Sequence, residues 1–281
     1  MPDGRPVDPN ERCLFAPSGK PRGPRVMTDT PTFVTLTIDR QVAWIRIDNP
    51  AKRNSLTAAD IDVFIGHLDA VAQMPAIRAL IIAGGSSGTF CAGASLDELS
   101  RGELTADQFE RLTDRIAAIA VPTICAMNGN AFGGGVEIGL CCDFRIGVRG
   151  MRLFVPAARF GLCYPPKGIR RYVHQLGPAT TKRLLVASEE LDAGTLLSVG
   201  YLTHLVEPGQ ADARATELAG QIAELAPLAV AAMKAICNGA TDGNLDAGVA
   251  GELAKHCRQS EDLREGLRAV AERRKPVFRG K

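Results

Sequence analysis

The sequence has no apolar run that approaches the roughly 18–20 residues of a membrane-spanning helix. It also has no large excess of one charge, because 33 basic and 31 acidic side chains leave a formal net charge of +2. Such a small charge excludes a strong overall attraction to nucleic acid or to an anionic membrane. We therefore expect a soluble, cytoplasmic protein with neither nucleic acid nor a membrane as its partner.

Patterns typical of metal and redox sites are absent as well. None of the eight cysteines forms a C-x-x-C pair, and most of them lie within apolar stretches. This distribution is typical of reduced, buried cysteines in a cytosolic protein. The four histidines show no spacing typical of ligands, so the sequence predicts no metal.

Residues 1–30 differ in composition from the rest of the chain. They are rich in proline and glycine, show no hydrophobic period and lack the apolar segment of a secretory signal. We expect a disordered extension here. The whole chain has 281 residues, of which 46% are hydrophobic, and this suffices for one large core, with or without a small accessory domain.

Hydrophobic periodicity predicts both strands and helices after the extension. Residues 34–38 and 42–47 alternate in polarity around a short turn, which indicates a β-hairpin. Thr57 begins a predicted helix, with Asp60 as its capping-box partner. Residues 79–82 form a short buried strand. Repeated units of this kind favour an α/β fold in which strand–strand–helix units stack around one core.

From residue 211 onward the pattern changes to helices alone. Glycine, proline and serine separate the predicted helices, which span residues 211–225, 228–237, 245–257 and 261–273. Their apolar side chains are too numerous for a free-standing tail, so we expect them to pack between subunits. The chain is thus divided into an extension (1–30), an α/β core (31–210) and a helical oligomerisation region (211–281).

Two glycine-rich loops, residues 90–96 and 129–137, each follow a predicted strand. Small residues leave the backbone N–H groups uncovered, and two such donors aimed at one point form an oxyanion hole that stabilises negative charge on a carbonyl oxygen. Glu137 lies one helical turn after Gly134, among apolar neighbours. Burial raises the pKa of a carboxyl and a helix N-terminus lowers it, so this side chain could exchange protons near neutral pH.

The two loops, the segment 49–56 and the closing run 261–278 resemble the enoyl-CoA hydratase/isomerase family, also called crotonases, in their order and rough spacing. The resemblance implies a crotonase-like spiral of strand–strand–helix repeats and an enzyme that acts on an enoyl-CoA or related acyl-CoA. It implies no cofactor, because coenzyme A enters as part of the substrate. It also implies a homotrimer or homohexamer.

The same resemblance assigns roles to individual residues. The amides of Ala94 and Gly134 form the oxyanion hole, and Glu137 is the acid/base that holds and activates water. Residues of the loops and of the C-terminus are expected to bind the CoA thioester, and Lys275 and Phe278 to close over the adenine within the chain or from a neighbouring subunit. The complete expected set is Lys52, Arg53, Ser55, Ala92, Gly93, Leu96, Pro156, Ala157, Leu162, Lys275 and Phe278.

The sequence departs from the family pattern at a second acid. Hydratases of this family carry another glutamate in a Pro-Glu step, where this chain has Pro156 and Ala157. The loss of one member of a proton-handling pair costs about 10²–10⁴ in rate. We therefore expect reduced or altered hydratase activity. Double-bond isomerisation, other crotonase chemistry, or acyl-CoA binding with weak turnover are the alternatives.

A remote alternative from another class is a serine hydrolase. Residues 84–88 match the G-x-S-x-G nucleophile elbow with Ser86 at its centre, and His174 or His204 could act as the base. An elbow must lead directly into a helix, whereas the residues after this segment have no helical character. The sequence thus favours the crotonase interpretation.

Overall fold

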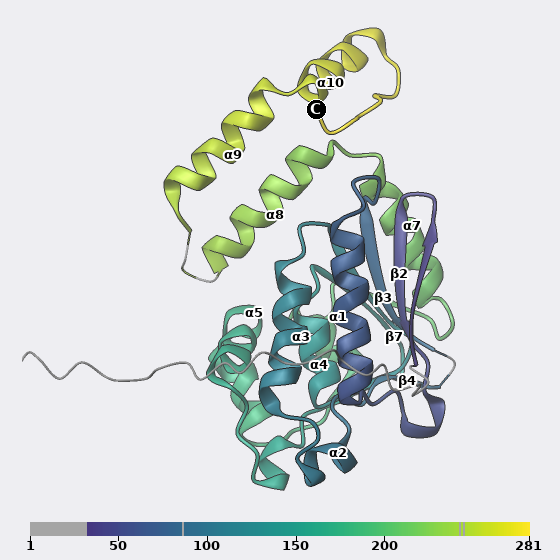
Figure 1. Ribbon diagram of the computed structural model, residues 1–281, viewed down its shortest axis with the longest axis vertical. Coiled ribbons are helices and arrows are strands. Elements are labelled where there is room, and N and C mark those ends of the chain that lie inside the picture. Colours follow the sequence, from purple (N-terminus) through teal and green to yellow (C-terminus); the bar gives the residue numbers. More distant parts are fainter. Residues whose placement is uncertain (1–32, 86, 242, 244) are drawn as a thin grey trace, which may run out of the picture. The chain divides into compact units, whose positions relative to one another are not determined.

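The computed structural model describes residues 33–85, 87–241, 243 and 245–281 (Figure 1). Its strands are β1 (Val34–Asp39), β2 (Val42–Ile47), β3 (Ala79–Gly84), β4 (Thr89–Cys91), β5 (Thr123–Met127), β6 (Asn130–Phe132), β7 (Phe144–Val148), β8 (Arg152–Phe154), β9 (Leu191–Asp192) and β10 (His204–Val206). The predicted extension, residues 1–30, lies outside the described residues.

Helices make up much of the remaining described chain. They are α1 (Ala58–Ala72), α2 (Leu96–Arg101), α3 (Ala106–Ala118), α4 (Gly134–Leu140), α5 (Pro166–Leu185), α6 (Ala193–Ser198), α7 (Ala211–Ala223), α8 (Pro227–Thr241), α9 (Ala247–Gln259) and α10 (Glu261–Glu272), with the 3-10 helices η1 (Pro50–Lys52) and η2 (Ala157–Phe160). The predicted capping box of α1 is confirmed, because the Thr57 side chain accepts from the Asp60 amide while the Asp60 carboxylate accepts from the Thr57 amide.

The strands form a six-stranded sheet, in the order β1-β2-β3-β5-β7-β10, and a four-stranded sheet, in the order β4-β6-β8-β9. The predicted hairpin is confirmed, since β1 and β2 pair antiparallel with Val34 opposite Ile47. The other pairings of the larger sheet are parallel. Strand β3 is buried at every position, as expected for a parallel strand covered on both faces.

Successive strands alternate between the two sheets. β3, β5 and β7 belong to the larger sheet, and each is followed by a strand of the smaller one, β4, β6 or β8. Helices follow each pair: α2 and α3 after β4, α4 after β6 and, beyond η2, α5 after β8. These stacked strand–strand–helix repeats confirm the predicted α/β architecture. Because β4 and β6 pair in parallel, the loops that follow them leave the smaller sheet at the same edge.

The C-terminal helices occur close to their predicted positions, and α8 and α9 lie side by side (Figure 1). Helix α9 begins at Ala247 rather than at residue 245, because the Asp246 side chain caps it by accepting from the amides of Gly248 and Val249. Helix α8 continues to Thr241, beyond its predicted end at residue 237. The Lys234 ammonium of α8 contacts the Asp143 carboxylate at 2.6 Å, which ties this helix to the α/β part.

Much apolar surface of these helices faces outward. The side chains of Met233, Val249, Leu267 and Val270 are each at least 59% exposed. Within the described residues no single helix is long and apolar enough to cross a membrane, although α7 and α8 together, bent by 111°, meet the same criterion of length and composition.

Candidate functional site

The two glycine-rich loops meet backbone to backbone. Gly93 has a positive φ of 83°, and a Cβ at this position would lie 2.4 Å from the Gly134 nitrogen. A Cβ on Gly135 would lie 2.2 Å from the carbonyl oxygen of Cys91. Any side chain at either position would force the loops apart, so glycine is required for this contact. The structure thus brings together the two loops that the sequence places some forty residues apart.

The hydrogen bonds of the first loop leave one amide unused. The Leu56 amide donates to the carbonyl of Gly93, and the Ser95 amide donates to the carbonyl of Leu56, each at 2.8 Å. Ala94 lies between these two bonds, and its own N–H meets no acceptor among the described residues. The N–H of Gly134 has none there either, as expected for the first residue of a helix.

Asn54 and Cys91 hold the first loop in place. Asn54 is buried, with a positive φ of 58° that asparagine tolerates better than most residues, and its side chain donates to the carbonyl of Thr89 at 2.8 Å. The thiol of Cys91 donates to the carbonyl of Asn54 and accepts from the Gly93 amide, at 3.2 and 3.3 Å. Sequence reasoning missed both residues, because these partners are 35 and 37 positions apart.

Glu137 is buried in the first turn of α4, with 5% of its surface exposed. The Arg171 guanidinium of α5 donates to its carboxylate at 2.9 Å and to the Thr113 hydroxyl at 3.0 Å. Arg171 also pairs with Asp114, which pairs in turn with Lys167. The carboxylate therefore lies at the inner end of a chain of alternating charges.

Burial raises the pKa of Glu137 and outweighs the lowering by the charge of Arg171. A buried carboxyl with a raised pKa is suited to accept and return a proton. Sequence reasoning missed Arg171. One signal could have revealed it: the beginning of α5 carries Lys167, Arg170 and Arg171 without an acidic residue, although a helix N-terminus disfavours positive charge.

The walls around Glu137 and Gly134 come from α3 and α5. A Cβ on Gly134 would lie 2.3 Å from the ring of Phe109, so this ring covers the start of α4. A Cβ on Gly168 would lie 3.0 Å from the Glu137 carboxylate, which places the first turn of α5 against the acid. Helices α3 and α5 thus pack against the start of α4, where the second glycine loop meets the buried carboxyl.

Residues 37–281 match the family model described as enoyl-CoA hydratase/isomerase. This chain belongs to that family, the crotonases. It is 33% identical to enoyl-CoA hydratase domain-containing protein 2, mitochondrial, of Bos taurus over 85% of this chain and 84% of that protein. It is 29% identical to the crotonyl-CoA hydratase of Syntrophomonas wolfei over 87% of this chain and 97% of that protein. The solved structure of an enoyl-CoA hydratase from Polaromonas superposes with a TM-score of 0.80 at 26% identity, over 88% and 99% of the two chains.

Family membership confirms the resemblance stated from the sequence, and the solved relatives confirm the fold class. In this crotonase, Lys52 and Arg53 are exposed beside the first glycine loop, where the Ala92 amide donates to the carbonyl of Arg53 at 3.1 Å. Lys52 pairs with Asp97 at 3.1 Å. Leu96, in the same loop, is 58% exposed. Ser55 follows with a half-buried side chain.

The segment that contains Pro156 and Ala157 folds back on itself. Ala157 is buried at the start of η2, after Pro156, and its carbonyl accepts from the Leu162 amide at 2.9 Å. Leu162 itself is 45% exposed.

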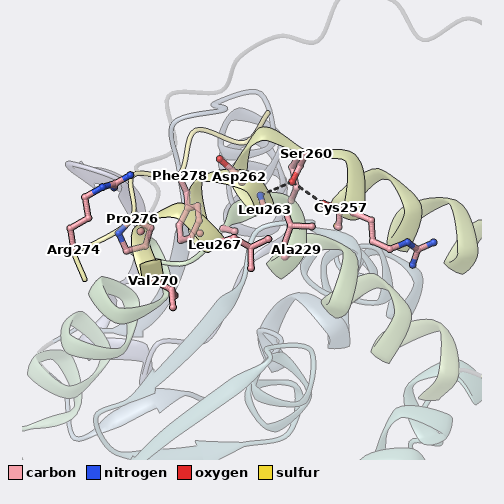
Figure 2. Close-up of a pocket in the computed structure, with 15 residues that line it drawn as sticks. Ala229, Cys257, Ser260, Asp262, Leu263, Leu267, Val270, Arg274, Pro276 and Phe278 are labelled. Carbon is pink, nitrogen blue, oxygen red and sulfur yellow. Dashed lines mark hydrogen bonds between the residues drawn. The ribbon is translucent and has the colours of Figure 1, made fainter. Parts of the chain in front are cut away.

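Lys275 and Phe278 have their contacts in the helical region. Lys275 is 88% exposed and contacts Glu224 at 3.5 Å. Phe278 lines a pocket of about 490 Å³ together with Leu263, Leu267 and Val270 (Figure 2). Within one chain the structure does not bring these two residues to the glycine loops.

The segment proposed as a nucleophile elbow leads from β3 into strand β4 and not into a helix. The strand–turn–helix geometry of a serine hydrolase is therefore not formed. Ser86 itself lies outside the described residues. His204 contacts the Thr203 hydroxyl at 2.9 Å through its Nδ1.

Proposed function

We propose that this crotonase binds CoA thioesters and stabilises their enolate, with the amides of Ala94 and Gly134 donating to the thioester oxygen. The proposal is supported by two amides without an acceptor among the described residues, on loops that touch backbone to backbone, and by a buried carboxyl one helical turn after the second amide. Preorganised N–H donors of this kind are worth several kcal/mol when charge develops on the oxygen. Gly134 also begins α4, so the partial positive charge of the helix N-terminus would further stabilise negative charge on the thioester oxygen.

Hydration of a 2-enoyl-CoA is the reaction that these groups support best. Glu137 accepts a proton from water as the water oxygen bonds to the β-carbon, and the π electrons move onto the thioester oxygen. The positive charge of Arg171 favours the ionised carboxylate, while burial strengthens it as a base. Turnover should be slower than in a relative with two glutamates, because Ala157 supplies no second carboxyl.

The CoA portion is proposed to run along the exposed rim formed by Lys52, Arg53 and Ser55, past Ala92, Gly93 and Leu96. Basic side chains there suit the phosphates of CoA. Pro156, Ala157 and Leu162 would bound the acyl end. Lys275 and Phe278 could then reach the adenine only from a neighbouring subunit, which fits a homotrimer or homohexamer held together by the apolar surface of α8 to α10.

Calorimetry with acetoacetyl-CoA and crotonyl-CoA tests the proposal. We expect both to bind, and Arg53→Gln to weaken binding severalfold. Arg149→Gln is the control, since this arginine is also exposed and pairs with Glu207 outside the glycine loops. No heat of binding with either ligand at millimolar concentration would contradict the proposal.

Isomerisation is the second candidate, and the replacement of the second acid by Ala157 favours it. A single base can move a proton from the α-carbon to the γ-carbon without a partner. Parallel assays with a 2-enoyl-CoA and a 3-enoyl-CoA of the same chain length distinguish the two. Faster consumption of the 3-enoyl-CoA would assign isomerisation as the main activity, and binding of both without consumption would identify a binding protein.

A further inference from the structure

A tyrosine enters the site from the segment that lacks the second acid. After η2 the chain turns at Gly161, with a φ of 72°, and Tyr164 follows before α5 begins at Pro166. The Tyr164 hydroxyl lies 3.8 Å from the point that a Cβ of Gly133 would occupy, and the carbonyl oxygen of Ala92 lies 3.6 Å from the same point. The phenol therefore lies close to the turn at Gly133, directly before Gly134, and the first glycine loop lies close to the same turn.

The hydroxyl of Tyr164 is available to a ligand. The side chain is half-buried, and its ring packs against that of Tyr172 with centroids 6.2 Å apart. The hydroxyl has no hydrogen-bond partner among the described residues. Burial, and next the negative charge of Glu137, raises the pKa of Tyr164, so the phenol keeps its proton at neutral pH.

We propose that the Tyr164 hydroxyl is the second proton-handling group of this site and donates its proton to the α-carbon of the bound enolate. This inference rests on the proposed function. If the thioester oxygen accepts from the Gly134 amide, the α-carbon lies one bond from the carbonyl carbon, next to the turn that the hydroxyl approaches. The tyrosine thus supplies from residue 164 what Ala157 does not.

Glu137 and Tyr164 together account for every proton that is transferred during hydration. As the water oxygen bonds to the β-carbon, Glu137 takes one water proton and the π electrons move to the thioester oxygen. The enolate electrons then form a C–H bond with the Tyr164 proton and leave a phenolate. That phenolate recovers a proton from Glu137, which restores both side chains, so the net change is the addition of one water.

Tyr164→Phe tests this step, because it removes only the hydroxyl. We expect hydration of crotonyl-CoA to fall by about 10², while the Kd of acetoacetyl-CoA changes less than about threefold, the effect of an interaction made only in the transition state. Tyr172→Phe is the matched control: this tyrosine is fully buried and its hydroxyl has no partner among the described residues. It should leave hydration unchanged.

Ala157→Glu separates a catalytic from a structural role. If the new carboxyl donates the proton, Tyr164→Phe should lower the rate of hydration by less than about tenfold in the Ala157→Glu background. Such non-additivity is expected of two groups that perform the same step. Exchange of the α-hydrogens of butyryl-CoA with D₂O, followed by NMR, should fall in Tyr164→Phe in parallel with hydration.

Equal hydration and exchange in wild type and Tyr164→Phe would overturn the role of Tyr164 and leave the proposed function intact. Binding without any hydration or exchange in the wild type would also overturn it, since no proton transfer would remain to assign. Absence of CoA thioester binding would overturn both proposals together.

Discussion

Helix α4 and helix α9 represent two different regions of one chain. Residues 135–140 of α4 are all buried, and its first turn is packed against the loop that follows β4. Helix α9 has no buried residue and α8 has one, Ala232. The first helix is fixed by contacts within the chain on every side, whereas the second still has apolar surface to cover. Tight packing is thus concentrated in the α/β part, and exposed apolar surface in the helical part.

The largest difference between the two regions is expected in the rate of hydration when one glutamate is substituted in each region. Glu137→Gln keeps the shape of the buried side chain but cannot accept a proton, so hydration should fall by about 10² or more. Glu252→Gln changes an exposed residue of α9 that pairs with Lys255, and it should leave kcat/KM unchanged. Steady-state kinetics with crotonyl-CoA measure both. An unchanged rate in Glu137→Gln would show that the acid lies elsewhere.

A charge placed on the apolar surface of the C-terminal helices should separate the proposed subunits. Val270 of α10 is 79% exposed, and we expect Val270→Asp to lower the molar mass measured by light scattering at micromolar concentration, because an interface would bury this carboxylate. Val186→Asp is the control, since Val186 is 75% exposed at the end of α5. A wild-type protein that is already monomeric would contradict the assignment of this surface to subunit contacts.

Glycine-to-alanine changes compare the packing of the two helices. In α4, Gly135→Ala forces a methyl group against the carbonyl of Cys91 and should lower the free energy of unfolding by about 1–3 kcal/mol. In α9, Gly251 has open space around its Cα, so Gly251→Ala should raise stability by up to about 1 kcal/mol. Chemical denaturation gives both values. Equal changes in the free energy of unfolding for the two variants would mean that the contact between Gly135 and the carbonyl of Cys91 is not tight.

The smallest expected effect is a displacement of a pH profile. If Glu137 activates water as proposed, it must be ionised, and hydration should be lost as the pH falls through its pKa, which burial raises above 4.5. Arg171→Gln removes the cation that lowers this pKa, so the acidic midpoint of kcat/KM should move upward. Arg258→Gln in α9 should leave the midpoint in place. A midpoint that is unchanged in Arg171→Gln would exclude Glu137 as the titrating group.

Local patterns allowed much of the fold to be predicted. The hairpin, the capping box at Thr57 and the helical C-terminal part depend on residues that are near one another in sequence, and the structure contains each of them. Both glycine loops were also recognised, since glycine marks positions where backbones approach. The local sequence pattern could not predict the contact between the two loops through Gly93, because this contact depends on the pairing of β4 with β6.

The side chains that complete the site were missed for the same physical reason. Arg171 meets Glu137 across 34 positions of sequence, and Asn54 meets Thr89 across 35. No local period encodes such pairs, because they arise only when α5 packs beside α4 and when the 49–56 segment packs under the first glycine loop. Tyr164 likewise has no motif around it. Its position becomes visible only through Gly133.

The buried thiol of Cys91 has a practical consequence for chemical labelling. Burial raises the pKa of this thiol to about 12, so it is neither ionised nor accessible to maleimides and iodoacetamides under mild conditions. Cys163 and Cys237 are exposed by contrast. Because Cys163 directly precedes Tyr164, a fluorophore attached there would test the proposed ligand site, while one on Cys237 in α8 would test the proposed association of subunits.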